Sequence, residues 1–366
     1  MKTGLSLVEL AKEVERRASA KKDYVANTET GLAAVVDHDH VALRLGTNGN
    51  ALTLPINQHA HRQIAARLNI PAIYYDRMQE KQPGLLADNI NTWFRSEPDS
   101  RLVRTLDGTV RAFLSDKYRP LENEELAQAV LPILGELSVE IVSAQITDTR
   151  FYIKAIDRRI QKDIPSGAKM GDGSHVIFDT IAPALTISNS EVGSGALDIS
   201  VGVFTRICTN LAFFGERSMK KYHVGKAQGG MIGDDNYHLL SDQTRKLTDA
   251  AVWAQARDVV KNGFNEAQFT ALVDKVTGAA QKPIEGDPIK VVELTAKRFS
   301  LTDGEKSSVL SHLIKGGNLT QWGLSSAITR AAEDLPDYDR ASAFERFGGT
   351  LIDLPANDWR EIARAA

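Results

Sequence analysis

The chain has 366 residues, of which 42% are hydrophobic and 25% are charged, and its formal net charge is −3. This composition is typical of a globular protein with a main domain and a smaller one, and it excludes extensive disorder. A slightly acidic protein does not coat nucleic acid with its whole surface, so any basic site has to be local. The single cysteine, Cys208, excludes an internal disulfide and fits a reducing compartment.

The N-terminus predicts a helix rather than a targeting segment. Between residues 5 and 22, Leu7, Leu10, Ala11 and Val14 recur at helical spacing among charged residues. No apolar run approaches the roughly 18 residues that are needed to cross a bilayer. We therefore expect a cytoplasmic protein that does not contact membranes.

The rest of the N-terminal third predicts short strands followed by helices. We expect a weak strand over residues 30–36, a hairpin over 40–45 and 51–54 around Asn48-Gly49, and helices over 58–68 and 71–78. His59 and His61 are two residues apart, so one helix points them in different directions and they do not pair on a metal. We expect Tyr74, Tyr75 and Arg77 to be core and rim residues rather than a ligand site.

The next segment predicts two antiparallel hairpins with a helix between them. Asp107-Gly108 is a turn signal in the first hairpin, and residues 139–146 and 150–156 form the second. A helix begins after Pro120 with acidic residues in its first turn. Antiparallel strands with inserted helices indicate an α+β fold. The first hairpin carries five basic residues against two acidic ones between positions 101 and 119, which suits a solvated surface as well as a phosphate contact.

The stretch from Leu185 to Lys226 is the centre of the prediction. Two strand-like runs flank the turn Gly193-Ser194-Gly195, and the second run alternates apolar with polar residues from Leu197 onward. This pattern predicts a long hairpin with one apolar face. The second half of the stretch is basic, because five Lys and Arg residues stand against Glu216 among three aromatic residues and a histidine.

The C-terminal third predicts helices only. They are expected over residues 266–277, 289–298, 303–315 and 319–333, after a longer helix over 237–264. We therefore predict an α+β core domain over residues 1–282, in which an antiparallel hairpin sheet is backed by helices. A smaller helical domain is expected over residues 283–366, and its last part is acidic.

Motifs for catalysis are missing from the sequence. It contains no H-E-x-x-H, no cysteine cluster, no G-x-S-x-G and no G-x-G-x-x-G after a strand. The pair Glu124-Glu125 fits a helix start, and Asp234-Asp235 fits a polar loop. We therefore expect no catalytic residue, no metal and no cofactor, and we do not predict an enzyme.

The distribution of basic and aromatic residues predicts contact with single-stranded DNA. Cations on strands and loops can follow a phosphate backbone, while aromatic rings and histidine offer faces to unpaired bases. The predicted DNA-binding residues are Arg206, Arg217, Lys220, Lys221, His223 and Lys226, together with Lys154, Arg158 and Arg159 from a neighbouring hairpin.

Three sequence segments resemble a known family. Residues 190–211 combine S-x-x-G-S-G-A-L with F-T-R-I-C-T-N-L, residues 116–121 read D-K-Y-R-P-L, and residues 320–329 read T-x-W-G-x-x-x-A-I-T. These segments resemble a phage- and plasmid-borne family that is catalogued as a conserved domain of unknown function. The chain departs from that family at Asn189-Ser190-Glu191, where relatives commonly carry a histidine-aspartate pair.

The resemblance implies a mobile-element protein in the bacterial cytoplasm. At one remove, the succession of hairpins and helices is similar to single-strand annealing proteins of the RecT, Redβ and eukaryotic Rad-type class, an analogy of fold. It implies sequence-independent binding and annealing of single-stranded DNA by a homo-oligomer, without hydrolysis. The expected partners are a nuclease of the same element or a host single-strand-binding protein.

Two alternatives remain open at the level of sequence. One is a metal-dependent enzyme that acts on nucleic acid, which would need several acidic residues to converge on one site. The other is a protein-binding factor, with an anti-defence or regulatory role, whose acidic C-terminal third is the contact surface.

Overall fold

One antiparallel sheet forms the centre of the structure, a computed structural model that describes residues 4–46, 51–169, 176–205, 210–221 and 241–366. Its strands lie in the order β12-β11-β10-β8-β7, and β9 pairs with the first part of β10. The strands are β7 (Glu140–Ile146), β8 (Phe151–Ile156), β9 (Lys162–Lys169), β10 (Val176–Asn189), β11 (Leu197–Thr205) and β12 (Asn210–Lys221). The predicted hairpin is confirmed as β10 and β11, which pair antiparallel with Ile187 opposite Ile199.

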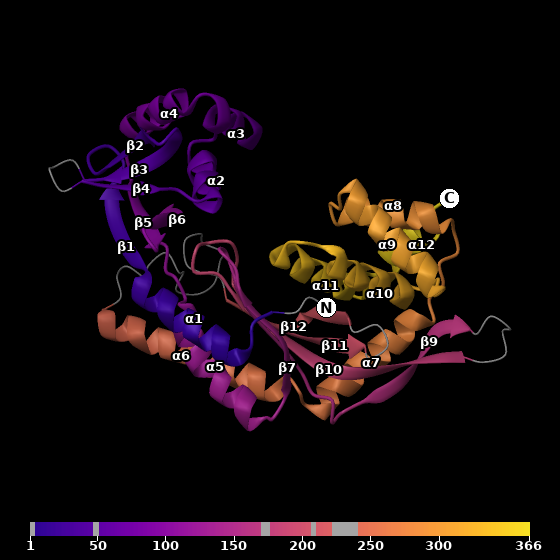
Figure 1. The fold of residues 1–366 in the computed structure, drawn as a ribbon. Helices are drawn as coiled ribbons and strands as arrows, with labels where there is room; N and C mark the ends of the chain where they lie inside the picture. The colour runs from indigo at the N-terminus through magenta and orange to yellow at the C-terminus, as the bar shows by residue number, and fades with distance from the viewer. Residues whose placement is uncertain (1–3, 47–50, 170–175, 206–209, 222–240) are drawn as a thin grey trace.

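The two faces of the central sheet differ in polarity. Ile153, Leu185, Ile187 and Ile199 point to an apolar core. The helices that share this core lie along the lower side in Figure 1; they are α1 (Leu7–Ala20), α5 (Asn123–Glu136), α6 (Asp242–Asn262) and α7 (Glu266–Ala280). The other face carries polar side chains, which α11 (Tyr338–Ile352) covers. All nine residues of β11 are therefore buried, so the expected polar face exists but is not exposed to solvent.

Residues 22–115 form a lobe with its own core, here called the N-lobe. It contains two three-stranded antiparallel sheets, β2-β3-β4 and β1-β5-β6. The strands are β1 (Lys22–Asn27), β2 (Leu32–Asp37), β3 (His40–Leu45), β4 (Leu52–Pro55), β5 (Ser100–Leu106) and β6 (Thr109–Ser115). The helices are α2 (Gln58–Arg67), α3 (Ala72–Lys81) and α4 (Pro83–Ser96). Helix α4 is not among the predicted elements, although a proline at the first helical position is typical of a helix start.

A second, purely helical lobe lies at the C-terminal end, here called the C-lobe (residues 283–366). It consists of α8 (Pro288–Arg298), α9 (Asp303–Gly316), α10 (Gln321–Ala331), the short 3-10 helix η2 (Ala332–Asp334), α11 and α12 (Ala356–Ala363). Most of its apolar side chains form a separate cluster around Leu324 and Phe344. Trp322 instead enters the core of the central sheet, where its indole N–H donates to Asp179 at 2.9 Å.

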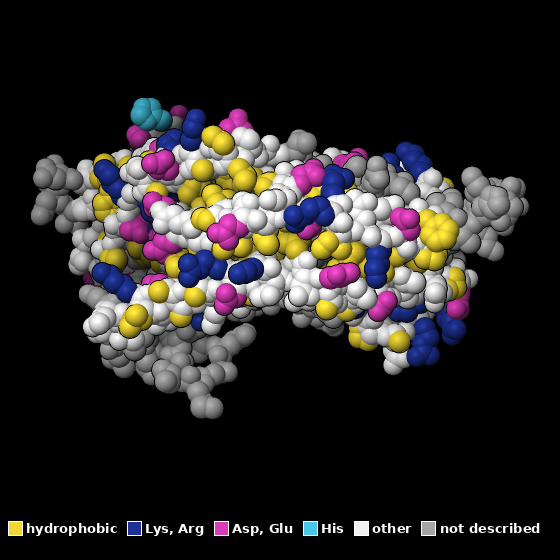
Figure 2. All heavy atoms as spheres, turned by 90° about the horizontal axis from the view of Figure 1, so that it is seen from below, with side chains coloured by type: hydrophobic (Ala, Val, Ile, Leu, Met, Phe, Trp, Pro, Cys, Tyr) yellow, Lys and Arg dark blue, Asp and Glu magenta, His cyan; other side chains and the backbone are white. Residues whose placement is uncertain are grey.

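The two lobes rise from the same side of the central sheet (Figure 1). The opposite, helical side is shown in Figure 2, where Lys and Arg side chains alternate with Asp and Glu instead of forming one basic area. Within the described residues, no helix is both long enough and apolar enough to span a membrane. Because basic and acidic side chains are mixed on the helical side, we expect a binding surface for an anionic polymer between the lobes rather than below the sheet.

Candidate nucleic-acid interface

The structure places the predicted DNA-binding residues at two opposite ends of the central sheet. Lys220 and Lys221 are the last two residues of β12. In the strand register they lie opposite Asp198 and Leu197 at the start of β11. Arg158 and Arg159 follow β8 at the other end of the sheet, and the guanidinium of Arg158 lies 4.8 Å from the ring centre of Phe204. The length of β11 separates the two groups by roughly 26 Å at about 3.3 Å per residue. The predicted site is therefore not one continuous patch.

Several predicted residues fall outside the described part of the chain. Arg206, His223 and Lys226 belong to this group, as does Cys208. Arg217 lies on β12, but its side chain is also outside the described part.

Lys154 is buried and is therefore not available for the predicted contact with DNA. It lies on β8 beneath α11, and its side chain is 1% exposed. Its ammonium forms an ion pair with Glu345 at 2.7 Å and donates to Ser342 at 3.0 Å. Burial alone would lower the pKa of Lys154, but the attraction of Glu345 outweighs it and raises the pKa above its usual value. A charged group that is buried and paired in this way does not reach a phosphate.

Arg158 and Arg159 are exposed, but acidic neighbours already bind them. Arg158 pairs with Glu140, and Arg159 pairs with Asp157 at 2.7 Å. The hydrogen bond from Arg159 lowers the pKa of Asp157, so this carboxylate stays charged beside it. These two arginines are therefore weaker candidates for a phosphate contact than their exposure suggests.

A polar cleft of about 430 Å³ opens between the lobes at the Lys220–Lys221 end of the sheet. One wall is the start of α2, and the other is the start of α11. Its floor is the turn between β7 and β8, residues 147–149. The lining consists of Asn57, Gln58, His59, Arg62, Thr147, Asp148, Thr149, Asp337 and Asp339.

Local hydrogen bonds fix both walls of this cleft. Asn57 caps α2 by accepting from the N–H of Ala60 at 2.9 Å, and Asp337 caps α11 by accepting from the N–H of Arg340 at 2.6 Å. Asp339 accepts from the hydroxyl of Thr147 at 3.1 Å and from that of Thr149, which ties α11 to the floor. The start of α11 is therefore fixed against the floor of the cleft, and the first turn of each wall helix is capped.

The charges around the cleft are mixed. Arg62 pairs with Asp76 through two contacts of 2.7 Å, and these hydrogen bonds lower the pKa of Asp76. Asp148 and Asp337 contribute negative charge to the lining. The positive side chains at this end of the sheet are Arg150, which follows the turn that forms the floor, Arg346 on α11, and Lys220 and Lys221 on β12. They are not among the residues that line the cleft, and β10 and β11 lie between β12 and β8. Arg346 donates to Ser188 at 2.7 Å.

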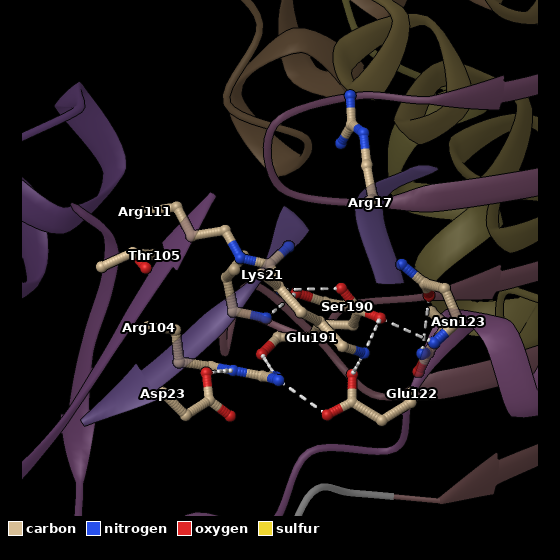
Figure 3. Close-up of polar contacts among 12 residues, drawn as sticks. Arg17, Lys21, Asp23, Arg104, Thr105, Arg111, Glu122, Asn123, Ser190 and Glu191 are labelled. Carbon is tan, nitrogen blue, oxygen red and sulfur yellow. Dashed lines mark hydrogen bonds and ion pairs between the residues drawn. The ribbon is translucent and has the colours of Figure 1, made fainter. Parts of the chain in front are cut away.

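A cluster of charged residues, buried at Arg104, Arg111 and Glu191, joins the N-lobe to the central sheet (Figure 3). We call Lys21, Asp23, Arg104, Arg111, Glu122 and Glu191 the charged junction. Arg104 is fully buried and donates to Asp23 at 2.9 Å, to Glu122 at 2.6 Å and to the carbonyl of Glu191 at 2.8 Å. Lys21 pairs with Glu122 at 2.8 Å, and Arg111 pairs with Glu191 at 2.9 Å.

The two carboxyl groups of the charged junction have opposite pKa shifts. Burial raises the pKa of Glu122. Burial also acts to raise the pKa of Glu191, but the guanidinium of Arg111 and a hydrogen bond from Glu122 lower it to about 2. The carboxylate of Glu191 also accepts from the N–H of Asn123, the first residue of α5, at 2.8 Å. Glu191 is therefore the charged member of the pair.

Divergent pKa values in a carboxyl pair are typical of acid–base catalysis. Here, however, the cavity beside Glu191 is too small for a substrate. The cavity beside Glu191 has a volume of about 10 Å³, which is enough for about one water molecule. Such a cavity is too small to enclose an organic substrate beside Glu191. The contacts of the charged junction hold the N-lobe above the sheet.

No local sequence pattern predicts this junction. Arg104 and Arg111 are two of the five basic residues of the first hairpin, which alternation alone places on a solvated strand face. The structure buries them at 0% and 5% exposure. Glu191 did draw attention, because it lies in the segment that departs from the family pattern, but nothing local indicates that it pairs with Arg111, 80 positions earlier.

Comparisons with known proteins found no similar protein. No family model, curated protein or solved structure matches this chain. Among the described side chains, no group of three or more His, Cys, Asp or Glu residues is arranged to hold a metal ion. The resemblance described above therefore stays a prediction, and any function has to be argued from the cleft.

Proposed function

We propose that the protein binds single-stranded DNA without sequence preference, in the cleft between the N-lobe and the C-lobe. One observation carries the proposal. The cleft opens at the end of the sheet that also carries Arg150, Arg346, Lys220 and Lys221, with β10 and β11 between β12 and the strands that form the cleft floor. Cations beside a polar cleft are the arrangement that proteins use to follow a phosphate backbone.

The size of the cleft favours a single strand over a duplex. About 430 Å³ is in the range of pockets that hold one small ligand. A duplex has a minor groove alone about 6 Å wide and a far larger diameter, so it does not enter such a space. The amide groups of Asn57 and Gln58 and the ring of His59 can contact unpaired bases, since side chains of these types offer hydrogen bonds or a flat face.

The acidic lining sets a limit on affinity. Asp148 and Asp337 repel phosphates, whereas Asp339 is engaged by two threonine hydroxyls. We therefore assign the phosphates to the Lys220–Lys221 side of the cleft and the bases to the α2 side. Arg158 and Arg159 at the far end of the sheet take no part.

The wider setting is part of the same proposal. The resemblance to a mobile-element family and to single-strand annealing proteins supports annealing of complementary strands inside a homo-oligomer, in the bacterial cytoplasm. A nuclease of the same element or a host single-strand-binding protein would supply or hold the strands. No bond is broken in this mechanism.

Fluorescence anisotropy of a labelled oligonucleotide tests the proposal. The same sequence is titrated as a single strand and as a duplex, at two salt concentrations. We expect binding that prefers the single strand and weakens with salt. Absence of binding at low salt contradicts the proposal, and so does cleavage of the oligonucleotide in magnesium that a chelator stops, because it would favour the metal-dependent enzyme.

A further inference from the structure

The small cavity beside Glu191 is lined by three arginines from three separate elements. Arg17 comes from α1, Arg111 from β6, and Arg150 from the residue before β8. Residues 147–149 line both this cavity and the large cleft. The cavity is therefore directly next to the space in which we place the DNA strand.

Two of the three guanidinium groups donate to neutral acceptors. Arg17 donates to the carbonyl of Thr147 at 2.8 Å, in addition to its ion pair with Glu13 at 2.7 Å. Arg150 donates to the carbonyl of Ser194 at 2.7 Å. Arg17 and Arg111 are also paired with Glu13 and Glu191, whereas the hydrogen bond of Arg150 to a neutral carbonyl does not cancel its charge. Asp148, which is exposed, is the other acidic residue of the lining.

Arg111 supplies a second, independent observation. Its side chain is at least nine-tenths buried and pairs with Glu191 through Nη2, while its Nε is buried without a hydrogen-bond partner. A buried donor without an acceptor is costly, by roughly 1–3 kcal/mol, and calls for an oxygen atom that the protein does not provide. The volume of about 10 Å³ admits one such atom.

The glycine at position 195 belongs to this arrangement. A Cβ at Gly195 would overlap the guanidinium of Arg150, so a larger residue there would require Arg150 to move away from the loop between β10 and β11. The loop that the sequence marks by Gly193-Ser194-Gly195 thus makes room for a cation at the cavity.

We propose that this cavity binds the terminal phosphate of a strand that lies in the cleft, an inference that rests on the proposed function. Arg111 at the base takes one phosphate oxygen, and Arg17 and Arg150 contact the others. An internal phosphodiester has two non-bridging oxygens and a single negative charge, so it cannot offer a separate oxygen to each of the three arginines. A terminal phosphate monoester presents free oxygens and a charge close to −2 to the three arginines.

The test compares oligonucleotides of one sequence with a 5′-phosphate, a 3′-phosphate or hydroxyl groups at both ends. Anisotropy is measured with an internal label, on the full chain. We expect one of the two phosphorylated strands to bind about tenfold more tightly than the unphosphorylated one, as for one charge-assisted hydrogen bond. The strand that gains affinity identifies the end that is bound.

Arg17→Ala and Arg16→Ala provide the matched pair of variants. Both residues lie on α1 and pair with Glu13, but only Arg17 lines the cavity. Arg17→Ala should lose the preference for the phosphorylated strand and keep its binding of the unphosphorylated strand, whereas Arg16→Ala should keep both.

The outcomes separate this inference from the proposed function. Equal binding of all three strands by the unmodified protein overturns the phosphate site and leaves the cleft proposal intact. Absence of binding by every strand overturns both. A preference that survives in Arg17→Ala also overturns the phosphate site, because it would arise elsewhere on the protein.

Discussion

Lys154 and Glu345 show why a basic residue on a strand is weak evidence for a binding site. Both side chains are at most 2% exposed, and they form the ion pair that docks α11 on the polar face of the sheet. The alternation of β8 indicates which face Lys154 occupies, but it does not indicate that a helix from 190 residues later covers that face. The position was therefore assigned to DNA, whereas its contact is internal.

This pair gives a prediction for stability. Lys154→Met leaves Glu345 buried without its partner, which should lower the free energy of unfolding by about 3–5 kcal/mol. The double variant Lys154→Met/Glu345→Met removes both charges and should recover most of that loss. Urea unfolding measures the three free energies. Losses that simply add in the double variant would show that the two side chains do not act as a pair.

His61 gives a prediction for the pH dependence of stability. It is 3% exposed and lies 2.8 Å from the hydroxyl of Tyr75, and burial lowers its pKa from 6.5 to about 4. Below pH 6.5 the unfolded chain takes up a proton that the folded chain does not bind, so folding stability decreases as the pH falls. From pH 7 to pH 5 this should cost about 2 kcal/mol, at about 1.36 kcal/mol per unit.

The measurement compares urea unfolding at pH 7 and pH 5 for three proteins. His61→Gln keeps a polar group near Tyr75 but does not titrate, so its loss between the two pH values should be smaller by that amount. His38→Gln, on an exposed turn, is the control and should behave as the unmodified chain. If His61→Gln loses as much stability as the unmodified chain, His61 is not the group responsible.

At the scale of elements, α11 depends on a close approach to β12. A Cβ at Gly349 would overlap the backbone carbonyl of Phe213, whereas a Cβ at Gly278 on α7 meets no atom within 4 Å. Gly349→Ala should therefore destabilise the protein by about 1–3 kcal/mol through overpacking. Gly278→Ala should stabilise it by about 0.5–1 kcal/mol, because alanine favours the helix. Thermal unfolding of both variants checks this contrast, which fails if the two shifts have the same sign.

Elements with local signals were predictable from the sequence. The hairpin at Asp107-Gly108 and the one at Gly193-Ser194-Gly195 are both present, because their turn residues and alternating strands act within a few positions. The capped helices of the C-lobe follow for the same reason. By contrast, the burial of both faces of β11 depends on α11, which lies about 140 residues further along the chain.

The candidate site was predictable only in part, because its walls come from distant segments. The basic end of β12 is recognisable from the sequence, but the cleft at that end of the sheet is formed by α2, the turn at residues 147–149 and the start of α11. The charged junction likewise brings Lys21, Arg104 and Glu191 together from three parts of the chain. Composition and spacing carry no information on such contacts, so sequence reasoning could name charges but not their partners.

At the scale of the molecule, the described residues contain separate apolar cores for the N-lobe, the sheet and the C-lobe. The N-lobe meets the sheet through the charged junction rather than through a shared apolar core. We therefore predict that Leu86→Ala, which removes a fully buried side chain of the N-lobe, increases hydrogen exchange mainly within residues 22–115.

Leu324→Ala is the corresponding variant in the C-lobe core. It should increase exchange in α8 to α12 and leave the N-lobe protected. Hydrogen exchange followed by mass spectrometry resolves these segments. Equal changes in all segments for both variants would show that the cores open as one cooperative unit.

The most direct test of the account is the salt dependence of single-stranded DNA binding in two double variants. Lys220→Gln/Lys221→Gln neutralises the end of β12, at the same end of the sheet as the cleft, and Arg158→Gln/Arg159→Gln neutralises the opposite end. Each lost phosphate contact lowers the slope of log K against log salt by about 0.7 for a single strand, so the first variant should lose about 1.4. The second should keep the slope of the unmodified protein. An unchanged slope in the first variant, or an equal loss in both, would contradict binding at the cleft.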